Sequence, residues 1–146
     1  MICVKILDMS DAGDDPLGYL LHRLATSLRT EVTSSVLEPL GISFPQYICM
    51  RFLAKSPGLS NADLAREVSV SPQAMNMVVR GLQDRGLVTR PASVASGRSL
   101  PAELTRDGVG LLARTDAGVH DAETKVLAPL SPEQRAVFKT LLATLG

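Results

Sequence analysis

The stretch from Leu59 to Leu104, LSNADLAREVSVSPQAMNMVVRGLQDRGLVTRPASVASGRSLPAEL, constrains the fold most, because two helix starts follow closely in it. Ser60 is a favoured N-cap residue, and Asp63 stands three positions later, where a carboxylate can accept the N–H of the cap and face the positive end of the helix dipole. Ser71 followed by Pro72 repeats the start signal, because proline at the first helical position needs no N–H. The sequence therefore predicts two short helices separated by a tight turn.

The second of these helices is predicted to have one apolar and one polar face. Met75, Val79 and Leu82 recur at i, i+4 and i+7, so they form a stripe that packs inward. The opposite face carries Gln73, Asn76, Met77 and Arg80. Amide groups suit adenine edges and a guanidinium suits guanine or phosphate, so this face is typical of a helix that binds in the major groove. An ordinary solvated polar face is the alternative explanation of this pattern taken alone.

The residues after the second helix have the pattern of a small β-hairpin. Gly86 stands at a natural helix C-cap, and residues 87–90 have the β-branched content of a strand. Residues 91–98 are rich in Ser, Ala and Gly with Arg98 near the tip, and residues 99–104 can return as a second strand. Helix, turn, helix, strand, basic loop and strand is the order of a winged helix-turn-helix.

This order of elements resembles the MarR family of bacterial transcriptional regulators. The segment LAREVSVSPQAMNMVVRGLQDRGLV is similar to the family's helix-turn-helix, and SGRSLPAELT is similar to its wing and the start of the next helix. We expect a mainly α fold with a small β-wing, with the winged helix-turn-helix in residues 41–104. Residues 15–40 and 105–146 are then a helical dimerisation region, and residues 1–14 a disordered or variable segment. The resemblance covers about Leu17 to Leu145.

Both ends of the chain carry apolar helices that so small a DNA-binding unit cannot cover. We predict a first helix from Asp15 to about Leu37, with residues 38–41 breaking the chain, and a last helix after Ser131. The last helix is strongly apolar, with Val137, Phe138, Leu141, Leu142 and Leu145. Because the two terminal stripes need a partner, we expect them to form the interface of a two-fold homodimer. A monomer whose ends fold onto its own core is the alternative.

A dimer of this kind presents two recognition helices to successive major grooves about 34 Å apart, so the expected target is double-stranded DNA with a palindromic operator. Ser60 and Ser71, with their helix N-termini, are expected to hold phosphates, and Arg98 is expected to enter a narrow minor groove. The predicted DNA contacts are Ser60, Ser71, Gln73, Ala74, Asn76, Met77, Arg80, Arg98 and Ser99.

The chain departs from the family pattern at three positions. Family members often have Gly where this chain has Ser69, a position that needs a left-handed backbone. Many also carry an acidic residue in place of Ser96 and a second arginine in place of Gly97. The wing is therefore less charged than usual.

The resemblance further implies a regulator, expected to be a repressor, that a small aromatic or phenolic acid such as salicylate releases from DNA. Its pocket is expected between the dimer helices and the winged helix-turn-helix, where an arginine can fix a carboxylate and rings can flank an aromatic body. The candidate lining residues are Tyr19, His22, Arg23, Tyr47 and Arg51. Tyr19 and Tyr47 can equally well be core residues whose rings are buried and whose hydroxyl groups reach water.

Composition limits the class of function. The chain of 146 residues has 15 basic and 15 acidic residues. Between residues 60 and 98, however, it has five arginines and only three acidic residues, which is a local excess of positive charge. Aromatic residues make up only 3% and there is no Trp, which argues against a platform for stacking single-stranded bases. No Gly-rich phosphate loop or metal-ligand cluster is present, so we expect neither an enzyme nor a cofactor. The apolar start, MICVKIL, is too short for an export signal, so we expect a cytoplasmic protein without a membrane partner.

Three alternatives share this fold. The two cysteines, Cys3 and Cys49, are too few for a disulfide framework, and Cys49 suits a small buried position. A regulator that senses oxidants through the Cys49 thiol is the first alternative. A regulator that responds to no ligand is a second alternative. A winged-helix module that binds proteins in place of DNA is the third, because the local excess of positive charge is modest.

Overall fold

The computed structural model describes residues 13–90 and 102–146, and these are mostly helical. The elements in chain order are α1 (Leu17–Val32), the π-helical turn η1 (Thr33–Leu37), α2 (Glu38–Leu40), α3 (Phe44–Lys55), α4 (Asn61–Val68), α5 (Pro72–Asp84), β1 (Val88–Thr89), β2 (Glu103–Leu104), α6 (Arg106–Val126) and α7 (Pro132–Leu145). The strands β1 and β2 pair antiparallel, with Val88 opposite Leu104. The predicted mainly α fold with a small β-hairpin is confirmed.

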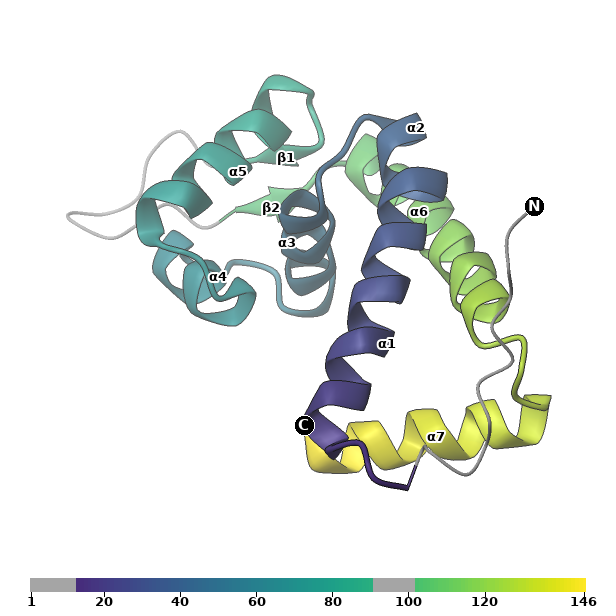
Figure 1. Ribbon diagram of the computed structural model, residues 1–146. Coiled ribbons are helices and arrows are strands. Elements are labelled where there is room, and N and C mark those ends of the chain that lie inside the picture. The colour runs from purple at the N-terminus through teal and green to yellow at the C-terminus, as the bar shows by residue number, and fades with distance from the viewer. Residues whose placement is uncertain (1–12, 91–101) are drawn as a thin grey trace.

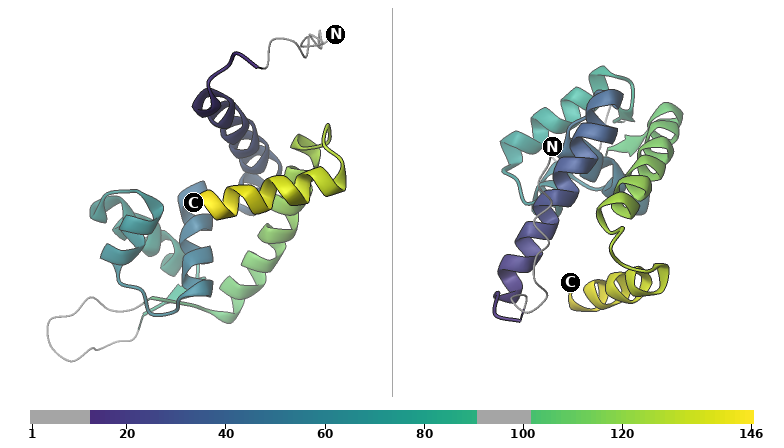
Figure 2. Two further views of the ribbon diagram at one scale, coloured as in Figure 1. Left: turned by 90° about the horizontal axis from the view of Figure 1, so that it is seen from below. Right: turned by 45° about the vertical axis from the view of Figure 1, so that its right-hand side comes forward.

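The helices form two groups. Helices α3, α4 and α5 lie together with the two strands, and α1 and α6 run away from them toward α7 (Figures 1 and 2). One continuous core nevertheless joins the groups, since Leu37, Met50, Leu64, Met75 and Leu82 are all fully buried in it. The predicted boundary between residues 15–40 and residues 41–104 therefore crosses a shared core, and the division into domains stays a prediction.

The helix-turn-helix begins and ends where its polar caps predict. The hydroxyl of Ser60 accepts the N–H of Asp63 at 3.1 Å, and the carboxylate of Asp63 accepts the N–H of Ser60 at 3.3 Å. The hydroxyl of Ser71 accepts the N–H of Ala74 at 3.1 Å. Between the two helices Ser69 has φ 58° and ψ 45°, the predicted left-handed conformation. The turn thus has the expected geometry without the glycine.

The first helical segment extends further than the sequence predicts. The chain does break within the expected residues 38–41, but only at their end: α1 continues through the wide turn η1 into α2 and stops at Gly41, which is left-handed with φ 67°. The wide turn shifts the hydrogen-bond register just before Pro39, so the missing N–H of that proline falls in the first turn of α2, where it is tolerated. A proline here marks a change of register and not the end of a helix.

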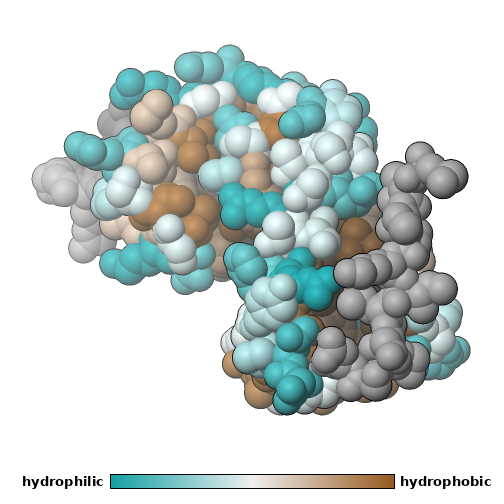
Figure 3. All heavy atoms as spheres, viewed as in Figure 1, coloured by the Kyte–Doolittle hydropathy of each residue, from teal (hydrophilic) through white to brown (hydrophobic). Residues whose placement is uncertain are grey.

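Helix α7 lies at the end of the molecule with most of its large apolar side chains exposed. None of its residues is buried, and the side chains of Leu141 and Leu145 are 58% and 84% exposed. Hydrophobic surface is visible in Figure 3 at the end of the molecule where α1 and α7 lie. In the described part of the chain, we find no helix long and apolar enough to cross a membrane.

Candidate nucleic-acid interface

The outer face of α5 is the most extended candidate surface for DNA. Met75, Val79 and Leu82 are fully buried and anchor the helix on α3 and α4. Because a helix repeats every 3.6 residues, this inward stripe turns the opposite side chains to solvent. The predicted contact residues Gln73, Asn76, Met77 and Arg80 are all exposed, and Ala74 is half-buried. One helix face therefore brings five of the nine predicted contacts together.

The two serine caps differ in what they can offer to a phosphate. The hydroxyl of Ser60 donates to a carboxylate oxygen of Asp63 at 2.6 Å while its oxygen accepts from the backbone of the same helix. These hydrogen bonds lower the pKa of Asp63, so the carboxylate stays charged beside the cap. Ser71 is exposed, and its hydroxyl oxygen accepts a hydrogen bond from its own helix. No acceptor for its hydroxyl proton lies among the described residues, so this proton can be donated to DNA. Arg98 and Ser99 lie outside the described residues.

Two residues outside the predicted set, Asn61 and Arg90, are linked to Asn76 by hydrogen bonds. Asn61, the first residue of α4, is buried and donates from Nδ2 to Oδ1 of Asn76. Arg90, directly after β1, donates from Nη2 to Oδ1 of Asn61. The only sequence signal was an asparagine at the start of an amphipathic helix, which is too common to single out.

The five predicted effector residues fall into two separate groups in one chain. Tyr19, which is 50% exposed, lies under the guanidinium of Arg23 on the first turns of α1, 5.8 Å from ring centre to Cζ, and His22 is exposed beside them. Figure 1 places this end of α1 away from α3. Tyr47 and Arg51 lie on α3, so one chain does not form a single pocket from all five residues.

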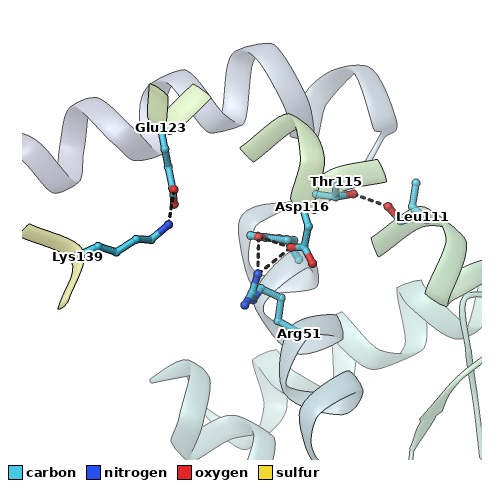
Figure 4. Close-up of polar contacts among 7 residues, drawn as sticks. Arg51, Leu111, Thr115, Asp116, Glu123 and Lys139 are labelled. Carbon is cyan, nitrogen blue, oxygen red and sulfur yellow. Dashed lines mark hydrogen bonds and ion pairs between the residues drawn. The ribbon is translucent and has the colours of Figure 1, made fainter. Parts of the chain in front are cut away.

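Tyr47 and Arg51 belong to a polar cluster that ties α3 to α6. Tyr47 is only 4% exposed, and its hydroxyl donates to Oδ1 of Asp116 at 2.8 Å. Arg51 donates from Nη1 to the same oxygen at 2.8 Å (Figure 4). Burial raises the pKa of Tyr47 above its ordinary value, so the ring stays neutral and donates. Tyr47 therefore lies in the core, and its role in effector binding stays a prediction.

A cavity of about 910 Å³ opens beside this cluster. Of the five predicted effector residues only Arg51 lines it. Its other walls include Arg29 from α1, Phe44 and Phe52 from α3, and Asp116 from α6. The guanidinium of Arg29 lies over the ring of Phe44, with Cζ 4.6 Å from the ring centre. Cations and aromatic rings thus meet here. Arg29 was not among the predicted residues, and Arg23 was, because helical periodicity cannot say which turn of α1 faces α3.

Comparison with known proteins identifies the family. A family model described as the MarR family matches residues 40–99. The HTH-type transcriptional repressor Rv2887 of Mycobacterium tuberculosis is 54% identical over 138 residues, which cover 94% of this chain and 99% of the repressor. This chain belongs to the MarR family.

Solved structures of the same relative match this MarR-family chain over nearly its whole length. The crystal structure of the Mycobacterium tuberculosis MarR family protein Rv2887 in complex with DNA has a TM-score of 0.81 and 49% identity, covering 91% of this chain and 99% of that chain. Its complex with salicylic acid has a TM-score of 0.77 and 54% identity, covering 92% and 99%. The predicted MarR resemblance is therefore confirmed.

Cys49 is poorly placed to sense oxidants in this MarR-family chain. Its side chain is fully buried in the core on α3. Burial raises the pKa of the thiol to about 11, and the nearby Arg90 cation offsets this only in part. Since the thiolate is the reactive form, a buried thiol with a raised pKa is inert. Cys3 lies outside the described residues.

Proposed function

We propose that this chain is a DNA-binding transcriptional repressor that acts as a two-fold homodimer on a palindromic operator. The exposed polar face of α5 carries the proposal, because it lies above a fully buried apolar stripe that fixes its orientation. The repressor Rv2887, which is 54% identical, has been crystallised with DNA. Two such helices related by a dyad fit successive major grooves on one side of the duplex.

In this arrangement each predicted residue type has a separate task. Gln73, Asn76 and Arg80 offer polar groups to base edges, and Ala74 and Met77 offer apolar contact to a thymine methyl. The free hydroxyl of Ser71 and the N-terminus of α5 bind a phosphate and set the register. Arg98 and Ser99, from the wing, contact the minor groove and its backbone.

A second copy of the chain supplies the cover that the terminal helices lack. Leu17 on α1 and Val137, Leu141 and Leu145 on α7 are all large apolar side chains with most of their surface exposed. Burying a side chain of this size is favourable by about 1.5–3 kcal/mol, so leaving this set in water is costly. A two-fold interface built from these helices buries them and fixes the spacing of the two α5 helices.

The cavity between α1, α3 and α6 is the proposed effector site, and a small aromatic acid is its proposed ligand. Arg29 and Arg51 can bind a carboxylate, and Phe44 and Phe52 can flank a ring. Rv2887 has been crystallised with salicylic acid and with p-aminosalicylic acid. A ligand that binds better to the dimer form whose α5 helices are misplaced lowers operator affinity by that difference in affinity.

The chain acts by binding in this proposal, so we assign it no catalytic activity, metal or cofactor. The described residues contain no group of three or more His, Cys, Asp or Glu side chains that could hold a metal ion. A regulator of chromosomal DNA works in the cytoplasm of a bacterial cell, which is the proposed location.

Selection of bound fragments from random DNA tests the proposed DNA-binding function. We expect an inverted repeat whose half-sites lie about one helical turn apart, with an affinity that falls steeply as salt rises. Binding to every fragment with equal affinity would rule out a sequence-specific repressor. Binding to none would leave a protein-interaction module as the better assignment.

Titration of the operator complex with salicylate tests the effector site. We expect salicylate to weaken operator binding and the uncharged salicylamide to have little effect, because the arginines bind a carboxylate. The Arg29→Met variant should lose the response while Arg23→Met, outside the cavity, keeps it. A response that depends on Arg23 and not on Arg29 would place the ligand elsewhere.

A further inference from the structure

A chain of three polar side chains connects the base of the hairpin to the DNA-facing helix. Arg90, directly after β1, donates to Oδ1 of Asn61, and Nδ2 of Asn61 donates to Oδ1 of Asn76. Asn61 is 9% exposed and lies on the inner side of α4, whereas Asn76 is exposed on α5. These three hydrogen-bonded side chains therefore connect a partly buried cation to the surface proposed to bind DNA.

The direction of every hydrogen bond in this chain is fixed by its first member. A guanidinium has five N–H donors and no acceptor, so the atom of Asn61 that faces Arg90 must be its oxygen. The other end of the Asn61 carboxamide is then Nδ2, a donor, and the atom of Asn76 that meets it must be an oxygen. The orientation of an amide group is normally ambiguous, but here the donor-only arginine decides both asparagines.

We propose that Arg90 and Asn61 are positioning residues that hold Asn76 with its Nδ2 group toward DNA, so that α5 offers a hydrogen-bond donor and not an acceptor at this position. The proposal rests on the proposed DNA-binding function and adds the specificity of one side chain to it. Asn76 makes the contact with the base, and the other two residues act through it.

This orientation changes which bases Asn76 can recognise. An unrestrained asparagine binds adenine with both ends of its amide, accepting from N6 and donating to N7. With its oxygen held toward Asn61, Asn76 keeps only the donating half of that pattern. Guanine presents two acceptors in the major groove, O6 and N7, whereas cytosine presents the N4 donor. We therefore expect Asn76 to favour guanine and to disfavour cytosine.

The variant Asn61→Asp keeps the hydrogen bonds between these three side chains but reverses the direction of the one to Asn76. A carboxylate only accepts, so one oxygen takes the hydrogen bond from Arg90 and the other can accept only from Nδ2 of Asn76. The carboxamide of Asn76 must then turn over and present Oδ1 outward. A carboxylate at the first position of α4 also suits the helix dipole, so we expect this variant to fold.

The matched control is Ala62→Asp. Ala62 is the next residue on the same turn of α4, and it is exposed. This variant therefore adds the same charge without changing the hydrogen bonds between Arg90, Asn61 and Asn76. Both variants should weaken binding to all sequences through repulsion of phosphates. Only Asn61→Asp should change the order of preference among bases.

The experiment is DNA selection with the full-length wild-type, Asn76→Ala, Asn61→Asp and Ala62→Asp proteins, each checked for folding by circular dichroism. Asn76→Ala should flatten the preference at one position in each half-site, where the wild type favours guanine over cytosine by roughly three- to ten-fold, the value of one hydrogen bond. Asn61→Asp should invert that G·C pair or replace it with an A·T pair, and Ala62→Asp should leave the pair unchanged. Arg90→Met should weaken the guanine preference without reversing it, because Asn61 can then adopt either orientation.

Several outcomes overturn the inference while leaving the proposed function intact. These are a wild-type preference for an A·T pair at the position that depends on Asn76, a uniform loss of affinity in Asn76→Ala, and an unchanged G·C pair in the same orientation in folded Asn61→Asp. If Asn61→Asp does not fold, the comparison of wild type with Asn76→Ala still decides, since a G·C pair at that position supports the proposal and an A·T pair contradicts it. A wild-type protein that selects no sequence at all contradicts the proposed function itself.

Discussion

At the scale of single residues, Ser69 has the left-handed backbone that the resemblance to the MarR family implies for this position. It is the one non-glycine residue with positive φ in the described ranges 13–90 and 102–146. Its N–H still closes the end of α4 by bonding to the carbonyl of Arg66 at 3.2 Å. The turn must reverse direction within two residues so that α5 can pack on α4, and that requirement outweighs the cost of a side chain in the left-handed region.

We predict that Ser69→Gly stabilises the protein. Glycine relieves a left-handed strain of about 1–2 kcal/mol but gives up part of this to the greater freedom of the unfolded chain, so the net gain should be about 0.5–1 kcal/mol. Urea unfolding measures it. The control is Ser56→Gly at the end of α3, where φ is −138°, and no gain is expected. Equal stabilisation by both changes would show that the conformation of Ser69 carries no strain.

At the scale of elements, the start of α6 is fixed to the backbone that leads into the hairpin. The hydroxyl of Thr105 caps Gly108 at 3.0 Å and donates to the carbonyl of Gly86 at 2.6 Å. A Cβ atom at Gly108 would lie 2.1 Å from the carbonyl oxygen of Leu87. Glycine is therefore required for contact between α6 and this turn, although glycine lowers helix propensity.

Two alanine substitutions in the same helix should have opposite effects. Gly108→Ala forces the helix away from Leu87 and should destabilise the protein by about 1–3 kcal/mol, the usual range for overpacking. Gly110→Ala meets nothing within 4 Å and should stabilise it by up to about 1 kcal/mol through helix propensity. Thermal unfolding of both variants makes the comparison. A loss of stability in Gly110→Ala would mean that this face of α6 is covered, for example by a second chain.

At the scale of the whole molecule, the exposed terminal helices make dimerisation and DNA binding a single property. Most large apolar residues of α7 lack cover within the chain. Two surface ion pairs, Lys139 with Glu123 and Lys125 with Glu31, lie along the helices of this region. Exposed pairs of this kind stabilise little. The position of the two α5 helices relative to each other therefore depends on apolar packing between chains.

We predict that Leu141→Glu separates the dimer and weakens operator binding. A carboxylate in the centre of the apolar stripe would have to lose its water when the second chain docks, which is strongly unfavourable. Ala143→Glu, about half a turn away around α7, should leave the dimer intact. Sedimentation at micromolar concentration distinguishes the two species. A wild-type protein that sediments only as a monomer would contradict the dimer, and a dimeric Leu141→Glu would move the interface away from this stripe.

The sequence alone determined the features that depend on residues within one or two turns of each other. The caps at Ser60 and Ser71 and the buried stripe of α5 follow from short-range hydrogen bonding and helical periodicity, whereas the left-handed Ser69 was implied by the family resemblance. The tertiary structure decided what depends on residues distant in the chain. Tyr47 is buried because it meets Asp116, 69 positions away, and the orientation of Asn76 is set by Asn61 and Arg90. Helical period shows which side chains share a face, but only packing shows which turn of one helix meets which turn of another.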